Sequence, residues 1–325
     1  MEFSEIQVIS DRIKKNVERV IIGKSNIIDM LITSMIAGGH VLLEDTPGTG
    51  KTMLAKSMAK SIDGRFNRIQ FTPDLLPSDI TGLNIFNQDL HTFEFVEGPV
   101  FSNILLADEI NRATPRTQSS LLECMEEKQV TIDGQTRILD KPFLVIATQN
   151  PIETAGTYTL PEAQLDRFIM QLSMGFPSEQ EELAIMERFI LDNPIDSLMP
   201  VCSKDEIIIM GERCRHVFVH NAVRKYIVDI VSATRNHASI SSGVSPRGTL
   251  ALLKTVQIYA AIHGRDYVTP EDVKELATLV LSHRIVSYTN MAKNSNKESI
   301  IRGIIGSVAV PTEDFAGKSI SGQDR

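Results

Sequence analysis

The residues with the clearest chemical potential form the run 48–52, Gly-Thr-Gly-Lys-Thr, which lies between an apolar segment at 40–43 and a helical segment at 53–61. A phosphate-binding loop requires this strand, loop and helix context. Glycine N–H groups there form a concave anion site, Lys51 can reach the β- and γ-phosphates, and Thr52 can offer a hydroxyl to Mg²⁺. The loop predicted to hold the nucleotide comprises Thr46, Pro47, Gly48, Thr49, Gly50, Lys51, Thr52 and Met53.

The loop departs from the general phosphate-loop pattern at its first position. The pattern has glycine five positions before Gly50, where this chain has Asp45. We expect an acid at that position to lie near the phosphates and to change the affinity or the geometry of the loop. The alternative interpretation of the glycines is a turn that caps a helix, and the acidic motif downstream argues against it.

A second motif is the apolar run 104–107, which ends in Asp108 and Glu109. Asp108 can hold Mg²⁺ through water, while Glu109 can polarise the attacking water as a general base. The alternative is a solvated strand end that caps the next helix. Because a phosphate loop precedes the pair in the chain, the catalytic interpretation is favoured.

A third apolar run, 143–148, is followed by Gln149 and Asn150. Ligands of open α/β sheets bind at the carboxyl edge of the strands, where an amide can orient water or sense the γ-phosphate. The alternative is that Asn150 and Pro151 form only a turn. Spacing alone favours the turn.

The elements that must position these residues can be read from the hydrophobic pattern. Short continuous apolar runs are typical of strands buried on both faces, so we predict an α/β fold with a mostly parallel sheet between helices. After residue 177 helical periods replace the strand pattern, so we predict a P-loop core at 1–177 and a separate helical domain at 178–325 whose end frays beyond Pro311. Two helices joined at Gly23 are predicted within 10–37. The predicted strands are 40–43, 68–71, 104–107, 143–147 and 168–172, and the predicted helices of the second domain are 183–190, 223–234, 246–259 and 270–287.

Composition and charge exclude several classes of protein. With 42% hydrophobic and 23% charged residues among 325, the chain is globular rather than disordered. Its 33 basic and 41 acidic residues give a net charge of -8, which argues against a general nucleic-acid binder. The longest apolar stretch, 27–37, is interrupted by Asp29 and is too short for the ~20 residues of a membrane span.

Cysteine and histidine usage favours a reducing compartment. The three cysteines are far apart and form no C-x-x-C pair, which argues against disulfides and a zinc ribbon. His216 and His220 would share a face if both lay on one helix, but no further ligand pair is nearby, so a metal site is disfavoured. The acidic start of the chain is unlike a secretory signal. We therefore expect a cytoplasmic protein.

Three longer motifs connect the chain to a known family. They are Leu-Pro-Ser-Asp-Ile-Thr-Gly at 76–82, Asp-Glu-Ile-Asn-Arg-Ala at 108–113 and Leu-Pro-Glu-Ala-Gln-Leu-Asp-Arg-Phe at 160–168. Together with the phosphate loop, they closely resemble the MoxR family of AAA+ ATPases, which belongs to the helix-2-insert branch. The resemblance runs from about Ile6 to Pro311.

The resemblance implies roles that spacing alone could not supply. It implies that 1–177 is the AAA+ P-loop ATPase core and that the helical domain at 178–325 is its lid. Asn150 matches the family's sensor 1, Arg167 matches the arginine finger that reaches the γ-phosphate of a neighbouring subunit, and Arg247 matches sensor 2 on the lid. Without the resemblance, ordinary surface pairing would be the preferred interpretation of both arginines. The segment that lies against adenine in AAA+ proteins corresponds to Val20, Ile21, Ile22 and Gly23.

Two hairpins fit the helix-2-insert branch. Residues 83–96 contain Phe93 and Phe95, which share a face if they lie on a strand, and Asp133-Gly134 is a strong turn signal for a second hairpin. By analogy both hairpins would face a ring pore or a bound partner. The alternative is that they are ordinary surface hairpins whose aromatic residues pack against the core.

The resemblance implies an ATP-hydrolysing, chaperone-like remodelling protein that uses ATP and Mg²⁺ and forms a homo-oligomer, with a hexameric ring as the expected form. It further implies protein clients and a partner with a von Willebrand A domain, in the maturation or activation of other proteins or the insertion of metal into them. Two alternatives remain open. One is a nucleic-acid motor or loader, which the net charge argues against, and the other is a scaffold that binds ATP but scarcely hydrolyses it, as Asp45 would permit.

Overall fold

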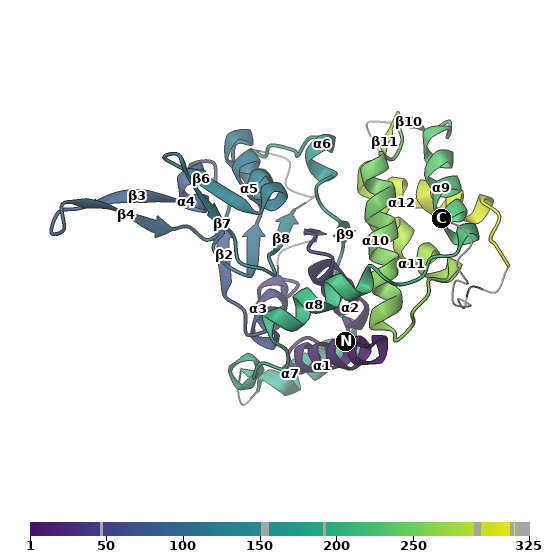
Figure 1. Cartoon of the computed structure of the whole chain (residues 1–325), viewed down its shortest axis with the longest axis horizontal. Helices are drawn as coiled ribbons and strands as arrows, with labels where there is room; N and C mark the ends of the chain where they lie inside the picture. The colour runs from purple at the N-terminus through teal and green to yellow at the C-terminus, as the bar shows by residue number, and fades with distance from the viewer. Residues whose placement is uncertain (46–47, 151–155, 191–192, 289–293, 313–314, 316–325) are drawn as a thin grey trace. The chain divides into compact units, whose positions relative to one another are not determined.

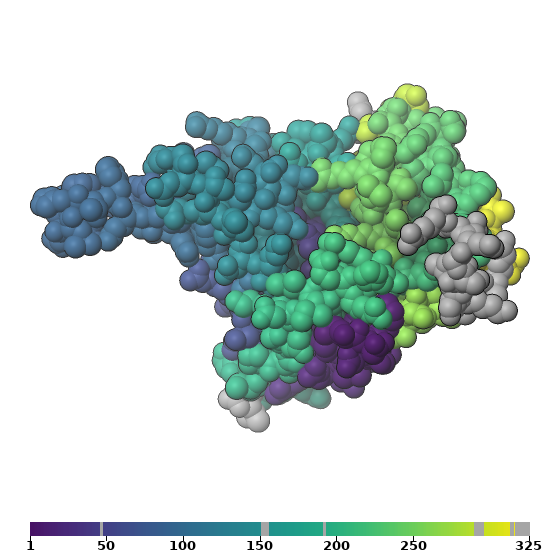
Figure 2. All heavy atoms as spheres, viewed as in Figure 1, coloured from purple at the N-terminus to yellow at the C-terminus, as the bar shows by residue number. Residues whose placement is uncertain are grey.

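The computed structural model describes residues 1–45, 48–150, 156–190, 193–288, 294–312 and 315. The chain divides into two compact units, drawn in Figures 1 and 2. One unit, called here the sheet unit, comprises residues 12–168 and 172–208, and the other, the helical unit, comprises 1–11, 169–171 and 209–325. The domain boundary that we predict at residue 177 stays a prediction.

A five-stranded sheet forms the centre of the fold, with the strand order β2-β5-β8-β1-β9. The pairs β2–β5, β5–β8 and β1–β8 are parallel. The predicted α/β class with a parallel sheet is confirmed, because the continuous apolar runs are strands whose residues are almost all buried. The strands are β1 Val41–Glu44, β2 Phe66–Gln70, β5 Ile104–Asp108, β8 Leu144–Gln149 and β9 Met170–Leu172.

Helices complete the sheet unit. Side chains of α5 pack with alternate residues of β5 and β8, such as Leu105 and Val145, in one continuous core, while α3 contacts β2 and β5. The helices that lie wholly in this unit are α2 Ser25–Ile36, α3 Lys51–Ser61, α4 Pro77–Thr81, α5 Pro115–Glu127, α6 Glu162–Leu165 and α7 Glu179–Phe189, with short 3₁₀ helices at Ile110–Arg112 and Pro194–Ser197. Two further helices, α1 Phe3–Glu18 and α8 Lys204–Cys214, each have residues in both units.

Both predicted hairpins are present in the sheet unit. The first pairs β3, Gly82–Asn87, with β4, Thr92–Glu97, and extends away from the sheet as a long two-stranded arm in Figure 1. The second pairs β6, Gln129–Ile132, with β7, Gln135–Ile138, and its turn residues Asp133 and Gly134 have positive φ angles of 50° and 77°. Positive φ at both turn positions is what a two-residue hairpin turn of type I′ requires.

The helical unit contains α9 Asn221–Arg235, α10 Pro246–Ile262, α11 Pro270–Leu281 and α12 Asn294–Ser307. The helix predicted to reach residue 287 is too long, because α11 ends at Leu281. A 3₁₀ turn at Ser282–Arg284 follows, and β11, Val286–Ser287, pairs with β10, Ile240–Ser242. The buried guanidinium of Arg284 donates to the carbonyl of Val280, which satisfies one of the acceptors left open at the helix end.

Among the described residues, no helix is both long and apolar enough to cross a membrane.

His40, just before β1, is a buried polar residue that joins two elements of the core. Its Nδ1 accepts from the N–H of Val145 at 3.0 Å, and its Nε2 lies 3.0 Å from the carbonyl oxygen of Met125. These two contacts fit the neutral ring with its proton on Nε2. Burial lowers the pKa of His40 from 6.5 to about 4.

We expect stability to fall as pH drops from 6.5 to 4. In that window the unfolded chain protonates His40 and the folded chain does not, so the free energy of unfolding falls by up to about 3 kcal/mol, at about 1.4 kcal/mol per pKa unit. Urea unfolding at several pH values measures this change, and His40→Gln should flatten it. An unchanged pH profile in His40→Gln, with the exposed His216→Gln as control, would contradict the assignment.

Candidate nucleotide-binding site

A pocket of ≈ 260 Å³ lies where the carboxyl ends of β1, β2, β5 and β8 meet the start of α3. The parallel sheet brings the three sequence motifs together here, because parallel strands end at a common edge. Thr46 and Pro47 lie outside the described residues. The predicted residues that line the pocket are Gly48, Thr49, Gly50, Lys51, Thr52, Met53, Asp108, Glu109 and Asn150.

The phosphate loop has the backbone geometry that its glycines predict. Gly48 and Gly50 have φ angles of +87° and +86°, a region that residues with a Cβ rarely adopt. Gly50 is the N-cap of α3, so the first helical turn, with Lys51, Thr52 and Met53, lines the pocket. A helix N-terminus of this kind binds anions such as phosphate.

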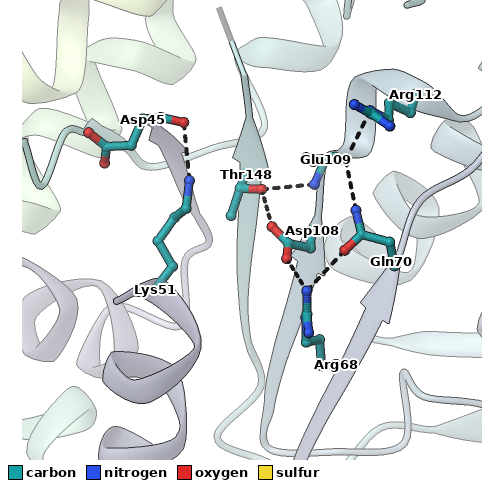
Figure 3. Close-up of polar contacts among 8 residues, drawn as sticks. All are labelled: Asp45, Lys51, Arg68, Gln70, Asp108, Glu109, Arg112 and Thr148. Atoms are coloured by element: carbon teal, nitrogen blue, oxygen red, sulfur yellow. Dashed lines mark hydrogen bonds and ion pairs between the residues drawn. The ribbon is translucent and has the colours of Figure 1, made fainter. Parts of the chain in front are cut away.

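Asp45 directs its carboxylate toward the segment that follows β9. Its oxygens accept hydrogen bonds from the side chain of Ser173 and from the N–H groups of Met174 and Gly175. Its backbone carbonyl oxygen accepts from Lys51 Nζ at 3.1 Å (Figure 3). The acid therefore has protein partners within this unit, while its effect on nucleotide affinity stays a prediction.

The hydroxyl of Thr148 forms a hydrogen bond with each of the two acidic residues. Thr148 Oγ1 donates to Asp108 Oδ1 at 2.7 Å and accepts from the N–H of Glu109 at 2.8 Å (Figure 3). Glu109 has a positive φ of 56°, an unusual conformation for a residue with a side chain. The contact with Thr148 fixes this backbone and thereby orients Glu109 relative to Asp108.

Three polar partners of the acids were missed by the sequence reasoning. Arg68 Nη2 donates to Asp108 Oδ2 at 2.7 Å and to Gln70 Oε1 at 3.0 Å. Gln70 Nε2 donates to Glu109 Oε2 at 2.8 Å, and Arg112 Nε lies 2.9 Å from the same oxygen. Arg68 and Gln70 are two apart on β2, so they share one face beside β5. That alternation was visible in the sequence, but the adjacency of β2 and β5 was not.

Asn150 lines the pocket and is 8% exposed. The other residues predicted from the family resemblance lie outside the described lining of the pocket. Arg167 is half-buried just after α6, in the sheet unit. Arg247 is exposed in the first turn of α10, in the helical unit. The segment Val20, Ile21, Ile22 and Gly23 connects α1 to α2, and a Cβ at Gly23 would lie 1.7 Å from Glu181 Oε1.

The oxygen donors in the pocket suit Mg²⁺. The Thr52 hydroxyl and the Asp108 carboxylate line the same pocket, and hard oxygen ligands are those that Mg²⁺ prefers. Among the described residues, no group of three or more His, Cys, Asp or Glu side chains could hold a metal ion by itself. His216 and His220 do not share a helix face, because α8 ends at Cys214 and His220 is the N-cap of α9.

The fold and site define a P-loop ATPase of the AAA class with a helical lid. Residues 40–170 match the family described as "ATPase family associated with various cellular activities (AAA)", and residues 232–304 match the AAA lid domain. A crystal structure of a putative ATPase from Cytophaga hutchinsonii superposes with a TM-score of 0.88 at 40% identity, covering 95% of this chain and 97% of that one.

Curated relatives give the family. "Chaperone MoxR1" of Mycobacterium tuberculosis is 41% identical over 305 residues, 91% of this chain and 80% of the relative. "Uncharacterized protein YeaC" of Bacillus subtilis is 49% identical over 303 residues, 93% of this chain and 95% of the relative. "Protein MoxR" of Paracoccus denitrificans is 30% identical and is covered over 90% of its length. The chain belongs to the MoxR family of AAA+ ATPases.

The Thr148 contact gives a prediction about the site. Thr148→Val keeps the shape of a side chain that is 1% exposed but removes the donor to Asp108 and the acceptor for the Glu109 N–H. We expect the free energy of unfolding to fall by about 1–3 kcal/mol and ATP hydrolysis to slow. Urea unfolding and phosphate release measure the two effects. Thr148→Ser keeps the hydroxyl, so equal behaviour of the Val and Ser variants would contradict this role.

Proposed function

We propose that the protein binds ATP with Mg²⁺, hydrolyses it, and uses the cycle to remodel protein clients as a chaperone-like machine. The observation that carries the proposal is the convergence of the phosphate loop, both acids and Asn150 on one pocket. The family supports it, since the chain belongs to an ATPase family and a relative bears the name "Chaperone MoxR1".

Each residue of the pocket has a role that its chemistry supports. Lys51 and the N–H groups of the loop hold the β- and γ-phosphates, and Asn150 orients the attacking water. Thr52 and Asp108 would hold Mg²⁺, which supplies positive charge against the phosphates when bound. Glu109 accepts a proton from water as general base, and its contacts with Gln70 and Arg112 determine where its carboxylate points.

Two arginines complete the proposed chemistry from outside the described pocket. Arg167 would act across a subunit boundary and Arg247 within its own subunit, each neutralising charge that develops on the γ-phosphate. This arrangement requires a homo-oligomer, and we propose a hexameric ring. Its support is the match of residues 165–168 and 245–247 to the family motifs together with the placement of Arg167 outside the pocket lining.

We propose the β3–β4 arm as the element that contacts a client or partner. Phe93 is 72% exposed and packs edge to face on Phe86 across the strands, with ring centroids 5.3 Å apart. Phe95 faces the same side but is half-buried, against Phe101 and beneath the Arg137 guanidinium at 4.0 Å. On this face of the arm, Phe86 and Phe93 therefore form an exposed aromatic pair, whereas Phe95 packs against other residues.

The family relationship is the support for the remaining proposals. A partner with a von Willebrand A domain and clients that the protein matures, activates or supplies with metal follow from the resemblance. A cytoplasmic location fits the three cysteines, which are buried and unpaired, as expected in a reducing compartment.

Substitution of Lys51 should impair ATP binding, whereas substitution of Glu109 should impair ATP hydrolysis. Lys51→Ala removes charge from the phosphate site, so we expect most ATP binding to be lost. Glu109→Gln keeps the shape of the side chain but removes the base, so we expect ATP to be retained and hydrolysis to slow by about 10²- to 10⁴-fold. Equilibrium binding of ATP and steady-state phosphate release measure the two quantities.

Three results would contradict parts of this assignment. Wild-type turnover in Glu109→Gln would exclude Glu109 as the base. Negligible turnover by the wild-type protein, with ATP bound, would favour the nucleotide-gated scaffold. Salt-dependent stimulation of turnover by DNA would favour the nucleic-acid motor.

The arm gives a prediction with an internal control. Phe93→Ala should leave the melting temperature and basal ATP turnover unchanged, because the ring is exposed, but should abolish stimulation by proteins that co-purify with Glu109→Gln in ATP. Phe95→Ala should lower the melting temperature, because it removes the contacts with Phe101 and Arg137. A drop in melting temperature for Phe93→Ala as large as that for Phe95→Ala would make the arm a structural element and leave the β6–β7 hairpin as the better candidate.

A further inference from the structure

Asp45 is a buried acid at the start of the phosphate loop whose carboxylate is bonded to another segment. The residue is 6% exposed. Its Oδ1 accepts from Ser173 Oγ at 2.8 Å and from the Gly175 N–H at 3.0 Å, and its Oδ2 accepts from the Met174 N–H at 2.6 Å. Hydrogen bonds to an ionised acceptor are stronger than those between neutral groups. Glycine, which the general phosphate-loop pattern has at this position, has no side chain to accept these hydrogen bonds.

The backbone of Asp45 joins two further parts of the site. Its carbonyl oxygen accepts from Lys51 Nζ at 3.1 Å, and its N–H donates to the carbonyl of Gln149 at 3.4 Å. One residue therefore contacts the phosphate-binding lysine, the end of β8 and the segment after β9. Any shift of the 173–175 segment would move the carbonyl that Lys51 contacts.

The segment 173–178, called here the connector, leads from β9 to α7 and has a second attachment. The carbonyl of Phe176 accepts from Lys24 Nζ at 3.3 Å. Ser178 caps α7 with Glu181, and the Glu181 carboxylate fills the space beside Gly23. The connector is thus bonded to Asp45 at one end and to Lys24 at the other, and Lys24 directly follows the 20–23 segment that we expect to contact adenine.

We propose that Asp45 is a positioning residue that couples the phosphate loop to the connector, so that nucleotide binding and the ordering of the connector favour each other. The inference rests on the proposed function, because it assigns the nucleotide to this loop. Coupling of this kind is reciprocal. A substitution in the connector that removes a hydrogen bond to Asp45 must then weaken nucleotide binding, although the connector lies outside the described lining of the pocket.

Ser173→Ala provides the most informative variant, because it removes one bond to Asp45 without changing a residue that lines the described pocket. We expect titration with a fluorescent ADP analogue to give a severalfold higher Kd for Ser173→Ala and about a tenfold higher Kd for Asp45→Ala, the scale of a lost charge-assisted hydrogen bond. The double variant should bind no more weakly than Asp45→Ala alone. Asp45→Asn keeps one acceptor oxygen and should recover part of the affinity.

Asp79→Ala is the matched control for a lost carboxylate, since Asp79 Oδ2 accepts from the Leu76 N–H at the start of α4. It should lower the melting temperature and leave the Kd unchanged. Hydrogen exchange supplies a second measurement: ADP should protect the Met174 and Gly175 amides in the wild type and in Asp79→Ala, but not in Asp45→Ala.

The coupling is overturned if Ser173→Ala binds ADP as the wild type does, or if the Ser173→Ala and Asp45→Ala effects on Kd multiply in the double variant. Should Asp45→Ala fail to fold, Ser173→Ala and Asp45→Asn decide the question. The proposed function fails separately, if the wild-type protein neither binds nor hydrolyses ATP. A wild type that hydrolyses ATP beside a Ser173→Ala variant of unchanged Kd overturns the coupling alone.

Discussion

The parallel pairing of β2, β5, β8 and β1 brings the carboxyl ends of four strands to one edge of the sheet, and the proposed chemistry depends on this edge. Register makes the placement specific. Gln70 is paired with Asp108, and Glu44 with Gln149, so the residues that follow each strand lie beside one another. The helix after β1 then adds its N-terminus to the same edge.

Charge balance at this edge determines how the site can respond to a nucleotide. The Asp108 carboxylate contacts the Arg68 guanidinium, and the Glu109 carboxylate contacts Arg112, so each acid has a cationic partner within the protein. A metal ion that binds Asp108 must compete with Arg68 for the Oδ2 atom. The Arg68 side chain is 47% exposed, which leaves it room to move away from that oxygen.

Features that depend on local sequence could be predicted, and features that depend on strand adjacency could not. The apolar runs located all five strands of the sheet within a few residues, and Asp133-Gly134 located the second hairpin, because burial and turn geometry are local properties. The roles of Arg68 and Gln70 depend on β2 lying next to β5, which no local pattern shows.

Asp45 and α11 show the same limit in different ways. The sequence identified Asp45 as a departure from the loop pattern, but its partners lie 128 to 130 residues away, so a role near the phosphates was the only one that could be inferred. The helical pattern of α11 continues past its end because Ile285 and Val286 are also apolar, but there the chain forms a 3₁₀ turn and then pairs β11 with β10. In both cases contacts distant in sequence decided the local structure.

The most direct measurement is an experimental structure of the assembled Glu109→Gln variant with ATP and Mg²⁺. The account predicts the β- and γ-phosphates on Lys51 and the first turn of α3, Mg²⁺ beside Thr52 and Asp108, and Arg167 of the adjacent subunit at the γ-phosphate. Nucleotide bound elsewhere, or an assembly in which Arg167 faces away from the neighbouring pocket, would contradict it.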